Sequence, residues 1–152
     1  MEPIQNNSVI KIEPLIFHYL YNNVILYFER ELKPKPTGLR ITNPHIKLYL
    51  IANHINPVIV DNKCKIKTPE QFERSSDSLI ICRKYSKYSS LVSVIAHFRN
   101  SLAHGRFLLY TMNGEIFIAL TDKPKKKEIS MVAQMPFRVF WGLIEMIKQN
   151  KR

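Results

Sequence analysis

The chain of 152 residues contains little cysteine and little glycine. Its two cysteines, Cys64 and Cys82, lie outside any CxxC pair and have no histidine at ligand spacing. This argues against a zinc site and against a framework of disulfides. With only 4 glycines, 45% hydrophobic residues and 23% charged residues, the composition is typical of a globular chain and excludes a disordered one.

The sequence also lacks a secretory or membrane-spanning segment. Residues 1–7 show no basic start followed by an apolar run, so we expect no signal peptide. The longest apolar region, residues 14–28, is interrupted by one histidine and two asparagines and is too short to cross a bilayer. No basic amphipathic helix with a clean polar face is evident. We therefore expect a cytoplasmic protein that has no membrane partner.

Motifs of nucleotide and metal chemistry are missing too. The chain has no P-loop, no GxGxxG motif and no paired carboxylates, so we expect no cofactor and no metal. What the chain has in excess is positive charge, with 23 Lys and Arg against 12 Asp and Glu, a formal net charge of +11. Such an excess favours a polyanionic partner, nucleic acid before an anionic membrane. The alternative is a generally basic surface without a specific partner.

Hydrophobic periodicity and capping residues predict several helices and a small sheet within one domain, residues 1–152. The Asn113-Gly114 pair is a strong signal for a two-residue β-hairpin turn. Residues 56–68 form either a loop or a brief edge strand. Helices are expected at 14–31, 44–55, 68–84, 90–104 and 136–148, and strands at 106–112, 115–121 and 128–133.

The main group of chemically active side chains lies at the end of the fourth expected helix. Arg99 can hold a phosphate with a planar fork of donors, and His104 can exchange protons near neutral pH. Asn100 can hydrogen-bond either a ligand or its neighbours. On a regular helix Arg99 and His104 would point roughly 140° apart, although a long arginine at a helix end can still share a site. His97 is seven residues before His104 and is expected on nearly the same face.

These side chains suit the cleavage of RNA without a metal. That reaction needs a base for the 2′-hydroxyl, an acid for the leaving 5′-oxygen and a cation for the phosphoryl oxygens. One chain supplies one well-placed imidazole and one guanidinium, and a two-fold dimer would bring two of each to one groove. The structural alternative is that His104 interacts with the helix dipole and that Arg99 is a surface charge.

Residues 99–104, with the sequence R-N-S-L-A-H, resemble the R-N-x-x-x-H signature of the HEPN superfamily. HEPN domains are helical domains found in many prokaryotic toxin and antiphage systems. The order of elements extends the resemblance loosely from Pro14 to Ile147, and the hairpin after the motif is similar to that of one hairpin-bearing subgroup. The resemblance implies a mainly α fold, an up-and-down helical bundle with a small antiparallel hairpin or three-stranded sheet inserted before the C-terminal helix.

The resemblance also implies a function, that of a metal-independent endoribonuclease acting as a toxin or antiphage effector. Its composite site would lie at the interface of a homodimer, with Arg99 and His104 acting and Asn100 orienting them. Further partners would be RNA and an antitoxin or another neighbouring-gene protein. The alternative is a non-catalytic dimeric HEPN module that binds nucleic acid or a partner protein. Candidate substrate contacts are His97, Arg106, Lys125, Lys126 and Lys127.

One departure from the family pattern concerns regulation. Some toxins of the family carry a tyrosine two residues after the histidine, which a partner nucleotidyltransferase modifies. Arg106 occupies that position here, so regulation of that kind is not expected.

Overall fold

The computed structural model describes residues 9–10, 14–35, 39–124 and 128–151. None of the helices in these ranges has a stretch long and apolar enough to cross a bilayer. Two π-helical segments, η1 (Tyr21–Leu26) and η2 (Phe28–Leu32), continue the first helix. The α-helices are α1 (Pro14–Leu20), α2 (Pro44–Ala52), α3 (Ser90–Ala103) and α4 (Phe137–Asn150).

The described strands join in one mixed sheet with the order β1-β4-β5-β6-β3-β2. β2 runs parallel to β3, while the other neighbouring strands are antiparallel. The expectation of a mainly α bundle with a small three-stranded sheet is therefore wrong. Of the described residues, 42% are helical and 21% lie in strands. The strands are β1 (Val9–Ile10), β2 (Val58–Val60), β3 (Leu79–Arg83), β4 (Phe107–Met112), β5 (Glu115–Asp122) and β6 (Met131–Pro136).

Residues 68–84 do not form the helix that the sequence predicts. They form turns followed by strand β3, which pairs with β6 on one side and with β2 on the other. Burial alternates along Leu79–Arg83, as it does in a strand. The short apolar run does not by itself distinguish a buried strand from a helix segment, and its pairing with β6 and β2 makes it a strand. Because β3 is a strand, residues 58–60 have a neighbour and form an edge strand, not a loop.

Other expected elements are confirmed. Strands β4 and β5 form the hairpin, with Met112 opposite Glu115 and a two-residue turn between them. Both turn residues, Asn113 and Gly114, have positive φ angles, of 55° and 76°. The expected third strand exists as β6 but lies three residues later than expected, at Met131–Pro136.

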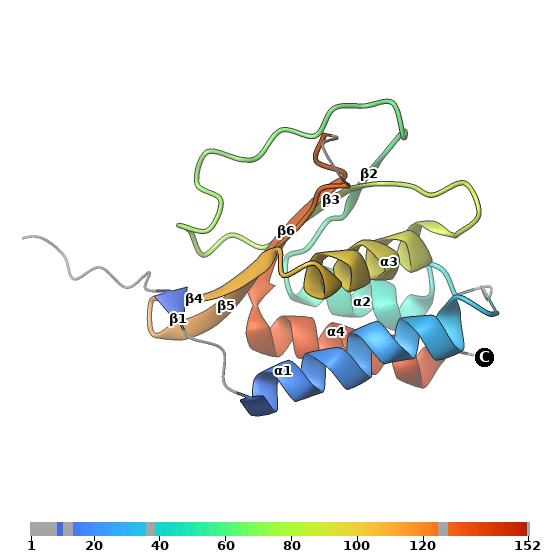
Figure 1. Cartoon of the computed structure of the whole chain (residues 1–152), viewed down its shortest axis with the longest axis horizontal. Coiled ribbons are helices and arrows are strands. Elements are labelled where there is room, and N and C mark those ends of the chain that lie inside the picture. Colours follow the sequence, from blue (N-terminus) through green and yellow to red (C-terminus); the bar gives the residue numbers. More distant parts are fainter. Residues whose placement is uncertain (1–8, 11–13, 36–38, 125–127, 152) are drawn as a thin grey trace, which may run out of the picture.

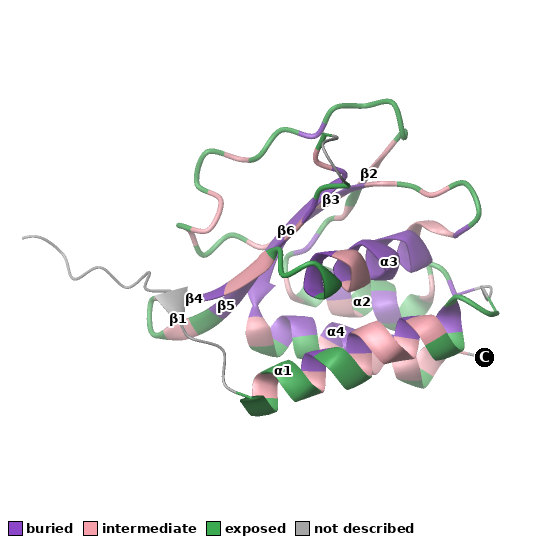
Figure 2. Ribbon diagram, viewed as in Figure 1, coloured by how far each residue is buried: buried purple, intermediate pink, exposed green. Residues whose placement is uncertain are grey.

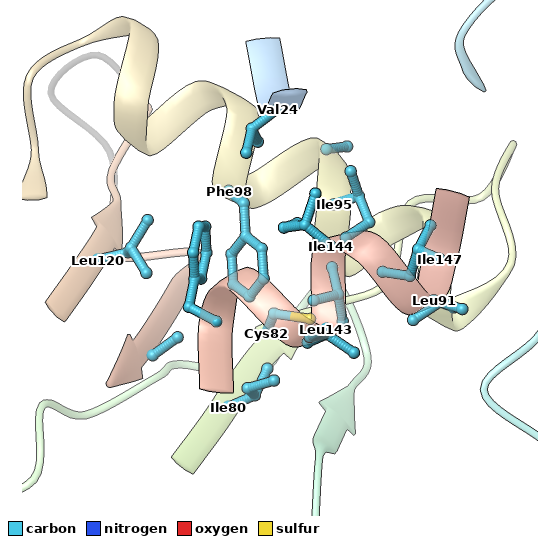
Figure 3. Packing of buried hydrophobic residues seen from close by; sticks show 14 of the residues in the cluster. Val24, Ile80, Cys82, Leu91, Ile95, Phe98, Leu120, Leu143, Ile144 and Ile147 are labelled. Atoms are coloured by element: carbon cyan, nitrogen blue, oxygen red, sulfur yellow. The ribbon is translucent and has the colours of Figure 1, made fainter. Parts of the chain in front are cut away.

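The helices cover one face of the sheet, and the long segment between β2 and β3 runs over the opposite face (Figure 1). On that opposite face Phe72 packs against a small cluster of Tyr110 and Phe117. The main core lies between the sheet and the helices. Figure 3 shows Phe98 of α3 between Leu120 of β5 and the apolar residues of α4.

Helix α3 is the central helix of this core. Ser89 caps its N-terminus by accepting a hydrogen bond from the Val92 amide. Figure 2 shows α3 buried over most of its length, with exposed residues only at its C-terminal end. The polar segment that carries the motif therefore reaches the surface where the helix ends.

Helices α2 and α4 approach each other closely at Gly142. A Cβ built on Gly142 would overlap the Tyr49 hydroxyl and lie 2.8 Å from the ring carbon Cζ. The Tyr49 hydroxyl is held there because it donates a hydrogen bond of 2.8 Å to the Val139 carbonyl. Glycine is thus required at this position because it leaves room for a neighbouring ring.

Substitution Gly142→Ala is therefore expected to destabilise the protein. Helix propensity alone favours alanine by about 1 kcal/mol. A displaced Tyr49 ring loses its hydrogen bond and its packing, and this loss exceeds the gain in helix propensity. We therefore expect the melting temperature to fall by about 2–4 °C. Differential scanning calorimetry measures this, and the fall should shrink in a Tyr49→Phe background. A melting temperature that rises in the Gly142→Ala variant would contradict the assignment.

Candidate functional site

His104 lies at the C-terminal cap of α3, and the chain turns sharply after it. Gly105 has a φ angle of +66°, the left-handed conformation that glycine adopts most readily. The Arg106 amide donates to the Ser101 carbonyl at 2.8 Å, and the Gly105 amide donates to the Leu102 carbonyl at 3.2 Å. These two bonds form a Schellman motif, which ends the helix. The His104 side chain is exposed and makes no hydrogen bond or ion pair within the described ranges.

The end of this turn is tied to the sheet. The Ser101 hydroxyl is fully buried, donates to the Arg106 carbonyl at 2.7 Å and accepts from the Thr121 amide at 3.1 Å. The Thr121 amide also donates to the Arg106 carbonyl. Strand β5 therefore determines where the last turn of α3 lies.

Arg99 is one turn earlier, and its side chain is 28% exposed. Its Nε lies 2.7 Å from Glu29 Oε1 of η2, in an ion pair whose N–H is not aligned for a hydrogen bond. Its Nη1 donates to Asn100 Oδ1 at 3.0 Å. The guanidinium thus has an acidic neighbour on one side and an amide oxygen on the other, and part of it remains open to solvent.

The Asn100 amide is held from the other side by two acceptors. Its Nδ2 donates to the Tyr85 hydroxyl at 3.1 Å and to Asp122 Oδ2 at 3.2 Å. Tyr85 follows strand β3, and Asp122 is the last residue of β5. Because Nδ2 faces these oxygens, Oδ1 faces Arg99.

His97 lies behind Asn100 and is completely buried, with 0% exposure. Its Nδ1 is 2.7 Å from Asp122 Oδ2, and its Nε2 is 2.7 Å from the Arg83 carbonyl oxygen. Its ring stacks on Tyr85 with a centroid separation of 4.6 Å. His97 is thus closed off from the surface, and it is linked to Asn100 through Asp122 Oδ2, which bonds to both.

The structure brings only some of the expected site residues together. Arg99 and Asn100 are in contact, and Asn100 and His97 meet the same Asp122 oxygen. The His104 side chain shares no hydrogen bond with any of them within the described ranges; only its backbone amide donates to the Asn100 carbonyl. Arg106 is exposed just after the turn. Lys125, Lys126 and Lys127 lie outside the described residues.

Three residues that sequence reasoning did not identify also belong to this site. Glu29 comes from η2, Tyr85 from the segment after β3, and Asp122 from the end of β5. Each is far from the motif along the chain and close to it in the fold. Their only sequence signal is weak: Asp122 is an acidic residue that ends a largely apolar strand, where a buried carboxylate needs a partner.

Tyr85 keeps its proton well into the alkaline range. Burial, assisted by the neighbouring Asp122 carboxylate, raises the pKa of Tyr85 to about 12. The phenol is therefore neutral at physiological pH, and its oxygen accepts the Asn100 hydrogen bond without a charge. No group of three or more His, Cys, Asp or Glu side chains within the described ranges could hold a metal ion.

The raised pKa of Tyr85 predicts a loss of stability in alkali. A tyrosine whose pKa is higher in the folded state than the unfolded value of 10 stabilises the fold below pH 10. This contribution is lost as the pH rises from 10 through about 12. Urea unfolding across this range should show a smaller decline for Tyr85→Phe than for the wild type. Equal declines in the two proteins would contradict the raised pKa, because other tyrosines are unchanged between them.

Comparison with known families gives a match that covers most of the chain. The profile of the family described as HEPN pEK499 p136 matches residues 15–149. The matched region runs from α1 to α4 and includes the whole motif helix. Searches of curated proteins and of solved structures returned no match.

Proposed function

Because the chain belongs to the HEPN pEK499 p136 family, we propose that it is a metal-independent endoribonuclease whose site is completed by a second copy of the chain. The observation that carries this proposal is the arrangement at the end of α3. A partly exposed guanidinium is oriented by an amide, and an exposed imidazole follows on the last turn of the same helix. The net charge of +11 suits a polyanionic substrate.

The proposed reaction is attack of a ribose 2′-hydroxyl on the adjacent phosphorus. One His104 imidazole takes the proton of the 2′-hydroxyl, and the new P–O bond forms as the P–O5′ bond breaks. The His104 of the second copy gives a proton to the leaving 5′-oxygen. Arg99 stabilises the negative charge that builds on the phosphoryl oxygens. The products are a 2′,3′-cyclic phosphate and a 5′-hydroxyl.

The biological setting that fits this activity is a toxin or antiphage effector acting on single-stranded or loop RNA. Such an activity needs a restraining partner, so an antitoxin or another neighbouring-gene protein belongs to the proposal. Arg106, exposed just beyond His104, is the proposed further phosphate contact.

A second candidate function is a non-catalytic dimeric module that binds nucleic acid or a protein. The ion pair between Arg99 and Glu29 favours it, because the guanidinium already has a carboxylate partner. Under this alternative Arg99 and His104 stabilise an interface and do no chemistry.

Variants Arg99→Ala and His104→Ala separate the two candidates. Under the nuclease proposal both variants fold and dimerise like the wild type, and RNA cleavage falls by roughly 10²–10⁴-fold. Wild-type cleavage should persist in EDTA and leave 2′,3′-cyclic phosphate ends, which mass spectrometry of the fragments detects. Matched controls are Arg138→Ala, which removes an exposed arginine of α4, and His45→Ala, which removes an exposed histidine of α2; both should cleave normally.

Two results would contradict the nuclease proposal. One is wild-type protein that leaves RNA whole while the Arg99 and His104 variants weaken the dimer in sedimentation, as the binding-module alternative predicts. The other is cleavage that depends strictly on added magnesium.

A further prediction concerns Glu29, which competes with phosphate for Arg99. Glu29→Gln should tighten the binding of an RNA made uncleavable by 2′-O-methylation. An ion pair at this degree of exposure is worth about 0.2–1 kcal/mol, so the gain should be at most about fivefold. The matched control is Glu31→Gln, which removes the same charge from η2. Glu31 pairs with Lys151 and not with Arg99. Fluorescence anisotropy should show a larger gain for Glu29→Gln, and equal gains would refute competition at Arg99.

A further inference from the structure

The buried pair of His97 and Asp122 lies directly beneath the motif, with exposures of 0% and 4%. His97 Nε2 faces the Arg83 carbonyl oxygen, which can only accept, so Nε2 carries a hydrogen. Its other nitrogen, Nδ1, faces Asp122 Oδ2 at 2.7 Å, and one hydrogen lies between these two atoms. The pair is therefore either an imidazolium with a carboxylate or a neutral imidazole with a carboxylic acid.

Asp122 Oδ2 also accepts a second hydrogen bond, from Asn100 Nδ2 at 3.2 Å. Two donors on one oxygen favour the ionised carboxylate, because a negatively charged acceptor strengthens both bonds. The same oxygen thus joins the buried histidine to the amide of the motif. Tyr85 adds a second acceptor for Asn100 Nδ2 at 3.1 Å.

A chain of hydrogen bonds consequently runs from the sheet to the guanidinium. Asp122 and Tyr85 fix which end of the Asn100 amide faces inward, and Asn100 Oδ1 then accepts from Arg99 Nη1 at 3.0 Å. If the amide turned over, its NH2 group would face the guanidinium, donor against donor. The orientation of Arg99 therefore depends on acceptors that lie outside the motif.

We propose that Asp122, held by His97, is a positioning residue that sets the Asn100 amide and through it the Arg99 guanidinium. Tyr85 is the second, weaker positioning residue. The proposal rests on the ribonuclease function proposed above and extends it to residues of β5 and of the segment after β3. In this proposal Asp122, His97 and Tyr85 do not touch the substrate.

Substitution Asp122→Asn tests this link because the new side chain cannot satisfy both neighbours. If the oxygen of the new amide takes the place of Oδ2, the His97 ring must be protonated at both nitrogens. No buried negative charge then balances the imidazolium, which is costly. If its NH2 group faces inward instead, the neutral His97 is satisfied but Asn100 Nδ2 meets another donor. The second arrangement is favoured, and it turns the Asn100 amide away from Arg99.

The decisive experiment is a double-mutant cycle between Asp122→Asn and Asn100→Ala, read as kcat and KM for a short RNA. We expect Asp122→Asn alone to lower kcat by about 10- to 100-fold and to change KM little. In the Asn100→Ala background the same substitution should cost almost nothing, because its route to Arg99 is already broken. Full and independent losses in both backgrounds would overturn the proposal.

A matched control separates positioning from simple destabilisation. Gln134 is fully buried like Asp122, and its amide NH2 donates to Ser75 Oγ and to the Asp77 carbonyl, away from the motif. Gln134→Ala should lower the melting temperature and leave kcat unchanged at temperatures well below it. A fall in kcat equal to that of Asp122→Asn would refute a specific role for Asp122.

Tyr85→Phe provides a second variant in case Asp122→Asn does not fold. It removes one of the two acceptors of Asn100 Nδ2 and leaves the buried pair intact. We expect a smaller loss in kcat, again absent in the Asn100→Ala background. An equal loss in both backgrounds would count against the proposed chain of bonds.

The inference can also be tested without RNA cleavage. In ¹⁵N-labelled protein the side-chain NH2 signals of Asn100, assigned by their loss in Asn100→Ala, should shift strongly in Asp122→Asn and in Tyr85→Phe. They should not shift in Gln134→Ala. If the wild type fails to cleave RNA, the proposed function fails, yet these shifts still support the link between Asp122 and Asn100. Unshifted signals would overturn the link even in an active nuclease.

Discussion

Helix α3 is buried at the centre of the fold, and its burial determines where polar groups can lie. The helix is enclosed by apolar side chains of the sheet and of the other helices over most of its length. A polar side chain in such a position must have a partner, since an unpaired buried polar group costs free energy. His97 and Ser101 are both fully buried, and each has partners supplied by other elements of the fold. Polar groups without such partners can lie only where the helix reaches the surface.

The motif lies at this transition from core to surface. His97 is completely buried, Arg99 and Asn100 are half-buried, and His104 is exposed, while Ser101 and Leu102 between them face the core. The buried end of the segment is held by Asp122, and the exposed end is held by the glycine turn and by Thr121. Because Asp122 and Thr121 are neighbours on β5, one strand controls both ends of the motif. The sheet therefore positions the residues of the site and also forms one side of the core.

Local signals were sufficient to predict the elements that are specified by short-range chemistry. The β4–β5 hairpin follows from Asn113-Gly114, the start of α2 from Asn43 before a proline, and the end of α3 from Gly105. Strand β3 could not be predicted in this way, because five apolar-rich residues match a buried helix segment as well as a strand. Its identity depends on pairing with β6 and β2, which are distant in sequence. If residues 68–84 were a helix, the sheet would lack β3 and β2 would have no neighbour, which agrees with the mainly α fold that the resemblance implies.

The residues of the candidate site also differ in whether a local signal in the sequence identifies them. Arg99, Asn100 and His104 could be selected from their chemistry and spacing within one helix. Glu29, Tyr85 and Asp122 could not, because the bonds that connect them to the motif span 15 to 70 residues of chain. His97 was proposed as a substrate contact from its helical register, but a register does not show which elements cover a face. Burial by β3 and β5 gives it a supporting position instead.

The proposed reaction requires the His104 imidazoles of two copies at one RNA phosphate. Mixing wild-type chains with His104→Ala chains, letting the subunits exchange and assaying RNA cleavage tests this requirement. A mixed dimer has only one imidazole in its shared site and should be inactive, so cleavage should fall with the square of the wild-type fraction. If cleavage falls only in proportion to the wild-type fraction while native mass spectrometry confirms the exchange, each copy acts by itself and the shared site is contradicted.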